Sequence, residues 1–178
     1  MKIYVARHGQ TDWNLEGKLQ GSTDVVLNKT GIDQAYFLSE NLKDVNFDLI
    51  ICSSLKRAVQ TAEIVNKDKK LEIIYCNDLR ERGFGELEGE LYPEIDTYWD
   101  YDKNDSSKGV EPVKSLLDRV FTAMDKITSE YKDKNILIVS HFCVMMAIDC
   151  YFNGFKDNHN FDNYYFNNGE FVEYSIEK

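Results

Sequence analysis

Reactive side chains follow three separate apolar segments of this sequence. Arg7 and His8 come directly after the first segment, and His141 comes directly after the third. Arg57 lies one helical turn beyond the end of the second. Short runs of this kind are typical of buried parallel strands, and ligands bind in the crevice outside the carboxyl ends of such strands. If the three strands are neighbours, two arginines and two histidines meet at one point.

The chemistry that these residue types suit best is phosphoryl transfer. A neutral imidazole such as that of His8 can attack phosphorus and hold it covalently, which splits one difficult displacement into two easier ones. The planar guanidinium groups of Arg7 and Arg57 match the spread charge of phosphoryl oxygens, and a protonated His141 would donate to the same oxygens. The leaving alkoxide needs a proton, and Glu81 is the candidate general acid.

The same cluster argues against a metal ion or other cofactor. Its cationic side chains stand where metal-dependent enzymes place divalent ions. The four cysteines of the chain show no C-x-x-C pairing that would indicate a structural zinc site. We therefore expect neither a metal nor a cofactor.

The elements that must position these residues alternate along the chain. Strands are predicted at residues 3–6, 48–52, 71–75 and 135–140, and helices at residues 30–42, 55–65, 113–131 and 142–152. Near the end, residues 163–166 and 170–176 flank Asn167, Asn168 and Gly169, which is a hairpin turn signal. The pattern predicts a three-layer α/β fold, with a mostly parallel sheet flanked by helices and an antiparallel edge strand. We expect a single domain over residues 1–178.

Residues 90–111 stand apart from this alternation. They contain seven acidic residues and two lysines, with Tyr98, Trp99 and Tyr101 among them. A long polar insertion of this kind is typical of a lid. Its acids would repel polyanionic substrates, and its aromatic rings would favour a ring-bearing leaving group.

Composition excludes several partner classes. The 178 residues carry a formal net charge of -10, which argues against nucleic acid because binding to it needs a basic face. No apolar run approaches the roughly 18 residues that a membrane span needs, and no signal peptide is recognisable. The cysteines are then expected to be reduced thiols in a cytoplasmic protein. We expect a small phosphomonoester as the partner, and the sequence indicates no oligomeric state.

Four blocks in order resemble the histidine phosphatase superfamily, the phosphoglycerate mutase-like group. The blocks are Arg7-His8-Gly9-Gln10-Thr11, Ser53-Ser54-Leu55-Lys56-Arg57-Ala58, Leu79-Arg80-Glu81 with Phe84-Gly85-Glu86, and Val139-Ser140-His141. The resemblance implies His8 as nucleophile, Glu81 as proton donor, and Arg7, Arg57 and His141 as the phosphate pocket. It also implies supporting contacts to substrate, from Thr11, Asn14, Gln20, Gly21 and Arg82.

The chain departs from that family in two places. Phe142 stands where the family usually has glycine, and Val110-Glu111-Pro112 stands in place of Gly-Glu-Ser. We expect Phe142 at the pocket edge, because it follows His141 at the same strand-to-helix corner. A phosphomonoesterase is the leading hypothesis, with α-ribazole phosphate as the first named substrate. The alternatives are a phosphoglycerate mutase-type phosphoryl transfer and a non-catalytic phosphate-binding module.

Overall fold

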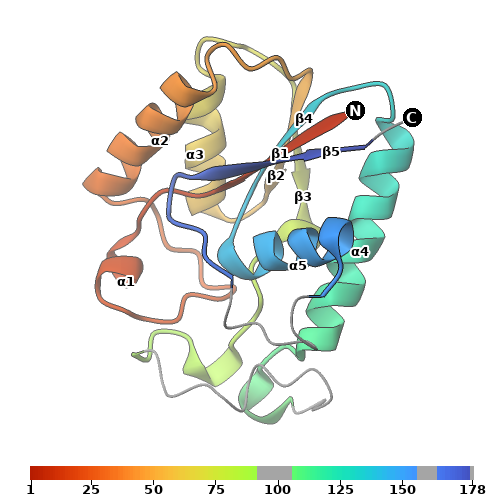
Figure 1. The fold of residues 1–178 in the computed structure, drawn as a ribbon. Coiled ribbons are helices and arrows are strands. Elements are labelled where there is room, and N and C mark those ends of the chain that lie inside the picture. Colours follow the sequence, from red (N-terminus) through yellow and green to blue (C-terminus); the bar gives the residue numbers. More distant parts are fainter. Residues whose placement is uncertain (92–105, 156–163, 177–178) are drawn as a thin grey trace.

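A five-stranded sheet forms the centre of the computed structural model, which describes residues 1–91, 106–155 and 164–176 (Figure 1). The strand order is β3-β2-β4-β1-β5. The strands are β1 (Lys2–Arg7), β2 (Leu49–Ser53), β3 (Ile73–Cys76), β4 (Ile136–Ser140) and β5 (Phe171–Ser175). Strands β1 to β4 are parallel, and β5 pairs antiparallel with β1 at the edge. The predicted mostly parallel sheet with an antiparallel edge is confirmed.

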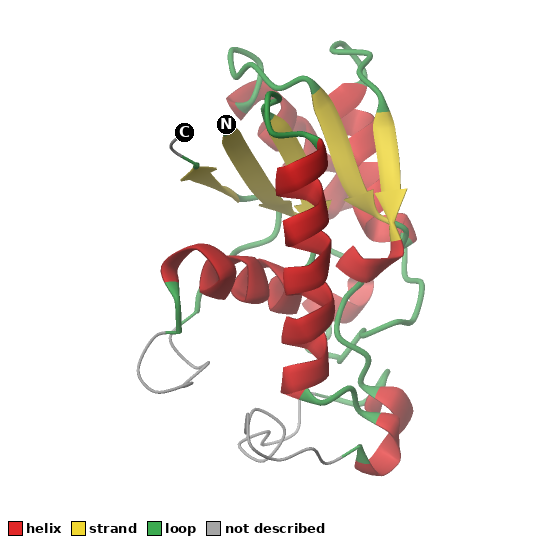
Figure 2. Ribbon diagram, turned by 90° about the vertical axis from the view of Figure 1, so that its right-hand side faces the viewer, coloured by secondary structure: helices red, strands yellow, loops and turns green. Residues whose placement is uncertain are grey.

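Longer helices cover both faces of this sheet, and one four-residue helix contributes to neither core. The helices are α1 (Asp12–Leu15), α2 (Lys29–Asn41), α3 (Lys56–Asn66), α4 (Val113–Glu130) and α5 (Phe142–Asn153), with short 3-10 turns η1 (Asn77–Leu79), η2 (Gly85–Leu87) and η3 (Ser107–Gly109). Alternate residues of β1 sort into two cores. Ile3 and Val5 pack in the core that includes α4 and α5, whereas Tyr4 and Ala6 pack in the core that includes α2 and α3. Figures 1 and 2 show the resulting three layers.

The longest helix shows why the sequence folds this way. Helix α4 begins after Pro112, and its buried residues recur at helical spacing, with Leu116, Val120, Ala123 and Ile127 on the face that meets the core. Figure 2 shows α4 crossing one face of the sheet, with α5 at its side. These helices leave the carboxyl ends of β1, β2 and β4 together at one edge of the sheet.

The predicted hairpin near the end of the chain is wrong. Residues 164–166, the described part of its first arm, form no strand, and β5 pairs with β1 instead. The backbone of the first arm serves other partners: the carbonyl of Phe166 accepts a hydrogen bond from Arg7 Nη1 at 2.7 Å. Gly169 in the turn donates to the carbonyl of Arg7 at 3.1 Å. The turn signal was real, but it joins a loop to an edge strand.

Residues 92–105 of the expected lid lie outside the described residues, and its flanks include η3. The four-residue helix α1 was not predicted, although Thr11 and Asn14 form a reciprocal capping box at its start. Across the described residues, no helix combines the length and the apolar character that a membrane crossing requires.

Candidate active site

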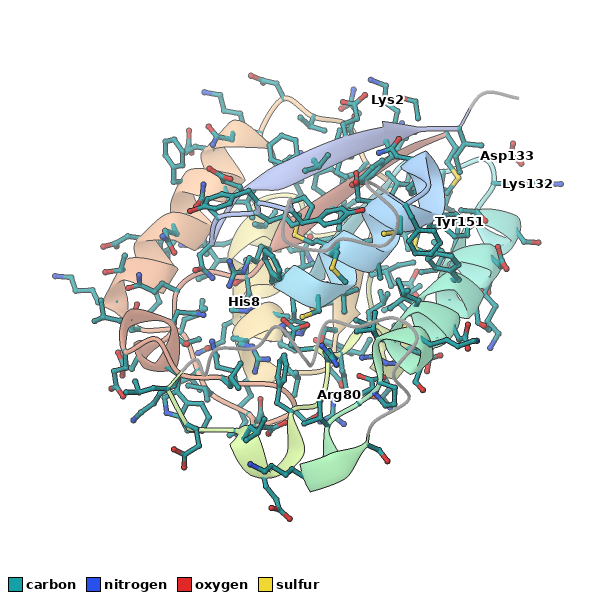
Figure 3. The ribbon with its side chains drawn as sticks, turned by 60° about the horizontal axis from the view of Figure 1, so that its bottom comes forward. Lys2, His8, Arg80, Lys132, Asp133 and Tyr151 are labelled. Atoms are coloured by element: carbon teal, nitrogen blue, oxygen red, sulfur yellow. The ribbon has the colours of Figure 1, made fainter. Side chains whose placement is uncertain are left out.

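The site is a cavity of about 440 Å³ at the carboxyl ends of β1, β2 and β4. It is lined by Arg7, His8, Asn14, Lys18, Leu19, Gln20, Gly21, Arg57, Glu81, Phe84, Phe142, Cys143 and Tyr165. Figure 3 looks toward this end of the molecule and shows His8 beside the first turn of α5. The crevice expected from the strand ends is therefore present, and it gathers most of the predicted residues.

The imidazole of His8 is held in one tautomer by its own neighbour. Nδ1 lies 2.7 Å from the carbonyl oxygen of Gly9, which can only accept, so Nδ1 carries the proton. Nε2 then keeps a free lone pair. Burial, together with the charges of Arg57 and Arg7, lowers the pKa of His8 well below 6.5. The ring is therefore neutral near pH 7, as a nucleophile must be.

The backbone around His8 is fixed by contacts from distant elements. The His8 amide donates to Ser140 on β4 at 3.0 Å, and the Gly9 amide donates to Thr61 Oγ1 at 3.1 Å. A Cβ on Gly9 would collide with the backbone of Gly31, so both glycines are needed for this close approach. The side chain of Asn168 donates to the His8 carbonyl at 3.0 Å.

The two arginines predicted for the phosphate pocket, Arg7 and Arg57, are anchored by backbone carbonyls. Arg57 is fully buried and donates from Nη1 to Thr23 at 2.8 Å and from Nη2 to Gly21 at 2.7 Å. The Glu88 carboxylate fixes that turn by accepting from the Thr23 amide at 2.9 Å. Burial lowers the pKa of Arg57 to about 10, which leaves it cationic at neutral pH. Arg7, anchored by Phe166, brings a second guanidinium to the same cavity.

His141 lies next to the nucleophile and is not among the described residues that line the cavity. Its ring centroid is 5.1 Å from that of His8, and its side chain is fully buried. Nε2 lies 2.7 Å from Ser53 Oγ. Burial, with the charge of Arg57 next in size, lowers the pKa of His141 well below 6.5. The ring of His141 is therefore neutral in the free protein near pH 7, and the case of a protonated His141 does not apply to this state.

Glu81 faces the start of α5. Its Oε1 accepts from the Cys143 amide at 3.2 Å and from the Arg82 amide at 2.9 Å. The Cys143 amide is one of the N-terminal donors of α5, which no side chain of the cap residue satisfies. Arg119, on α4, fixes the backbone at Glu81, since its Nη2 donates to the Glu81 carbonyl at 3.2 Å. The candidate acid is thus fixed at the cavity wall.

Two amide side chains present donors to the cavity. The Thr11 amide donates to Asn14 Oδ1 at 3.1 Å, and the Thr11 hydroxyl donates to Gln20 Oε1 at 2.9 Å. Because the amide oxygens are engaged in this way, the NH₂ ends of Asn14 and Gln20 are left to meet a ligand. Thr11 itself is fully buried and does not line the cavity, so it acts on these two residues.

Two other predicted residues differ in position. Arg82 does not line the cavity: its Nε donates to the Glu111 carbonyl at 2.7 Å, and its guanidinium lies over Phe84. Phe142 does line the cavity, as expected, and the guanidinium of Arg7 lies 5.4 Å from its ring centroid. The large side chain therefore leaves a cavity with His8 on its wall.

Five lining residues were not predicted. They are Lys18, Leu19, Phe84, Cys143 and Tyr165. The first four lie within two positions of predicted residues in the sequence, so proximity along the chain could have suggested them. Tyr165 has no such signal, and 86% of its surface is exposed at the cavity. Burial raises the pKa of the Cys143 thiol, which disfavours the reactive thiolate at this position.

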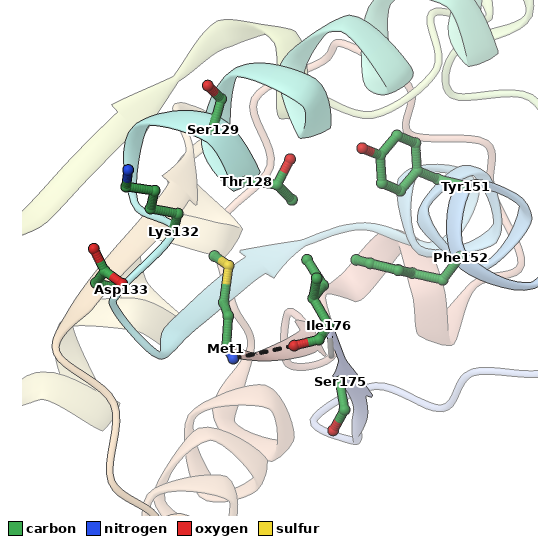
Figure 4. A pocket seen from close by; sticks show the side chains of 9 residues that line it. All are labelled: Met1, Thr128, Ser129, Lys132, Asp133, Tyr151, Phe152, Ser175 and Ile176. Carbon is green, nitrogen blue, oxygen red and sulfur yellow. Dashed lines mark hydrogen bonds between the residues drawn. The ribbon is translucent and has the colours of Figure 1, made fainter. Parts of the chain in front are cut away.

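A second, larger cavity of about 820 Å³ lies at the opposite ends of the strands (Figure 4). Met1 lies in it, and the N-terminal amine donates to the Ile176 carbonyl at 3.3 Å. Among the described residues that line it, Lys132 is the sole cationic side chain. It therefore suits an anionic ligand less well than the smaller cavity does.

Comparison with known proteins agrees with this geometry. The family model of the histidine phosphatase superfamily (branch 1) matches residues 3–178. The chain is 39% identical over 146 residues to an uncharacterized phosphatase, PhoE, of Bacillus subtilis, covering 82% of this chain and 74% of that one. It is 34% identical over 158 residues to a metal-independent phosphoserine phosphatase of Arabidopsis thaliana, covering 83% and 66%.

A solved structure extends the likeness to the fold. The α-ribazole phosphatase of Shigella flexneri superposes with a TM-score of 0.87 at 28% identity, covering 100% of this chain and 92% of that one. The fold, the order of the site residues and the relatives agree. This chain belongs to the histidine phosphatase superfamily.

Proposed function

We propose that this protein is a phosphomonoester hydrolase that works through a phosphohistidine on Nε2 of His8. The observation that carries the proposal is the tautomer of His8. Its Nδ1 donates to Gly9, and Nε2 is left as a lone-pair nitrogen on a ring that lines a cavity with two guanidinium groups.

The first step forms a bond from Nε2 of His8 to phosphorus and breaks the bond from phosphorus to the ester oxygen. The leaving alkoxide takes a proton from the carboxylic acid of Glu81. Arg7 and Arg57, with the NH₂ groups of Asn14 and Gln20, hold the three equatorial oxygens during the transfer. Positioning and charge therefore supply most of the catalysis.

The second step regenerates the enzyme. Water attacks the phosphorus, the bond from phosphorus to Nε2 of His8 breaks, and the carboxylate of Glu81 takes a proton from the water. Inorganic phosphate leaves, and His8 returns to the neutral tautomer. Glu81, the one carboxylate among the described residues that line the cavity, thus serves as acid and then as base.

We propose that the reaction needs no metal ion. The guanidinium groups of Arg7 and Arg57 supply the positive charge that divalent ions supply in metal-dependent phosphatases. The metal-independent relative from Arabidopsis thaliana supports this view. None of the four cysteines, all of which lie in the described part of the chain, forms a disulfide, which fits the cytoplasmic setting that we propose.

The substrate that we propose is a small phosphomonoester with a ring in its leaving group. Leu19, Phe84, Phe142 and Tyr165 add apolar and aromatic surface to the lining of the cavity, beside its charged groups. Aromatic side chains pack favourably on planar rings. α-Ribazole phosphate has such a ring, and the structural likeness to the Shigella flexneri α-ribazole phosphatase supports it as the first substrate to test.

The test is hydrolysis of p-nitrophenyl phosphate and α-ribazole phosphate in the presence of EDTA. We expect the wild type to hydrolyse both and His8→Asn to lose turnover, with His159→Asn as the matched control. Loss of activity on chelation, with rescue by magnesium or zinc, would overturn metal independence. Isomerisation of phosphoglycerate without hydrolysis would indicate a mutase, and binding of phosphate without any turnover would indicate a binding module.

A further inference from the structure

Ser53 and His141 are brought together by the sheet, although 88 positions separate them in the sequence. Ser53 is the last residue of β2, and His141 follows the last residue of β4. These strands are parallel neighbours, with Cys52 opposite Val139, so the two side chains meet at the same edge. Ser53 Oγ lies 2.7 Å from His141 Nε2, and both residues are fully buried.

The direction of this hydrogen bond follows from the number of protons available. The Leu55 amide donates to Ser53 Oγ at 3.3 Å, so the serine already accepts one bond. No further acceptor for the hydroxyl hydrogen is found among residues 1–91, 106–155 and 164–176, apart from His141 Nε2. If His141 donated instead, the serine hydrogen would be buried without a partner, which is costly.

If Nε2 of His141 accepts from Ser53, the ring proton must lie on the other ring nitrogen, Nδ1. Nδ1 is buried and has no hydrogen-bond partner in the described part of the chain. Its ring is 5.1 Å from the ring of His8, centroid to centroid. If Nδ1 of His141 carried only a lone pair, it would repel an anionic phosphoryl group on His8. If Nδ1 carried a proton, its N–H could donate to that phosphoryl group and so gain the hydrogen-bond partner that it lacks in the free protein.

We propose that Ser53 is a positioning residue, whose hydroxyl donates to His141 Nε2 and thereby keeps the ring proton on Nδ1 for the phosphoryl group. This inference rests on the proposed function for its use in catalysis. The tautomer itself is a property of the free protein and can be measured without any turnover. His141 then contributes a neutral donor of fixed direction beside two guanidinium groups.

The experiment combines nitrogen NMR on protein labelled with ¹⁵N-histidine and steady-state kinetics. The chain has three histidines, so His8→Asn and His159→Asn variants assign the signals. In the wild type at pH 7.5 we expect a protonated Nδ1 and an unprotonated Nε2 on His141. In Ser53→Ala we expect a mixture of tautomers and a fall in kcat/KM on the order of tenfold, typical of one well-placed hydrogen bond. Binding of orthovanadate should weaken by a similar factor.

Two variants separate positioning from structure. Ser53→Thr keeps the hydroxyl and should retain both the tautomer and the kinetics. Ser54→Ala removes a neighbouring hydroxyl that donates to Asn77 Oδ1 rather than to a histidine, and it should change neither. A protonated Nε2 in the wild type, or an unchanged tautomer in Ser53→Ala, would overturn the proposal. If the wild type hydrolysed no phosphomonoester, the proposed function would fail while the NMR result still decided the tautomer.

Discussion

Truncation of Phe142 to alanine probes the residue at which this chain departs most from its family. The ring is half-buried: it lines the cavity, lies under the guanidinium of Arg7 at 5.4 Å, and meets the ring of Phe166 edge-on at 5.9 Å. The edge contact is worth about 0.5–1.5 kcal/mol and the cation–π contact about 0.5–2 kcal/mol. The loss of these two contacts should lower the free energy of unfolding by about 1–3.5 kcal/mol, compared with the 3–5 kcal/mol typical of a fully buried phenylalanine.

The kinetic effect should separate substrates. Arg7 loses the ring beneath it, so KM for a small alkyl phosphate should rise by about twofold to fivefold, in line with a contact of 0.5–1 kcal/mol. A ring-bearing phosphomonoester also loses the aromatic wall, so its KM should rise further. Thermal unfolding and KM for the two substrates measure both effects in one variant.

Phe121→Ala is the matched control. Phe121 is also half-buried and meets the ring of Tyr151 edge-on at 5.5 Å, but it does not line the cavity. The Phe121→Ala variant should lower the melting temperature about as much as Phe142→Ala does, and it should leave KM for both substrates unchanged. If Phe142→Ala lowers stability and leaves both KM values at the wild-type level, Phe142 packs only in the core, and the argument that it shapes specificity is wrong.

Two further predictions concern protons. Glu81→Gln should slow hydrolysis of an alkyl phosphate by about 10²- to 10⁴-fold and that of p-nitrophenyl phosphate far less, because nitrophenolate needs no proton to leave; equal losses on both substrates would show that another group is the acid. The pKa values of His8 and His141 lie well below 6.5 in the folded state, chiefly through burial. Well above pH 6.5 both residues are neutral in the folded and in the unfolded chain, so their titration does not change the free energy of unfolding there. Below pH 6.5 the unfolded chain takes up protons that the folded chain does not, and stability should fall by up to about 1.4 kcal/mol per pH unit for each residue. Urea unfolding at pH 7.5 and 5.5 measures this, and an equal dependence in His141→Gln would contradict it.

The sheet and the centre of the site could be predicted because both follow from local patterns. Short apolar runs predict buried strands, and parallel strands bring their carboxyl ends to one edge. His8 and Arg57 therefore met in the structure as expected. The charge of -10 gave no hint of this, because a few arginines gathered at one edge decide the local potential.

The remaining features depend on contacts between distant parts of the chain. The bond from Arg7 to the Phe166 carbonyl spans 159 positions, and no local pattern predicts it. The same is true of Ser53 and His141, and of Tyr165 at the cavity. The misread hairpin has the same origin, since the turn at Gly169 is local but its partner strand is β1. Topology decides these contacts.

The measurement that tests the account most directly is rapid quenching of the wild type during turnover, followed by peptide mass spectrometry. We expect a phosphoryl group on His8 that is labile in acid and stable in base, as a phosphoramidate is. His8→Asn, in which the nucleophile is absent, should carry none, and Glu81→Gln should form the intermediate slowly from an alkyl phosphate. A phosphoryl group on another residue, or turnover by His8→Asn at a tenth of the wild-type rate or more, would contradict the mechanism.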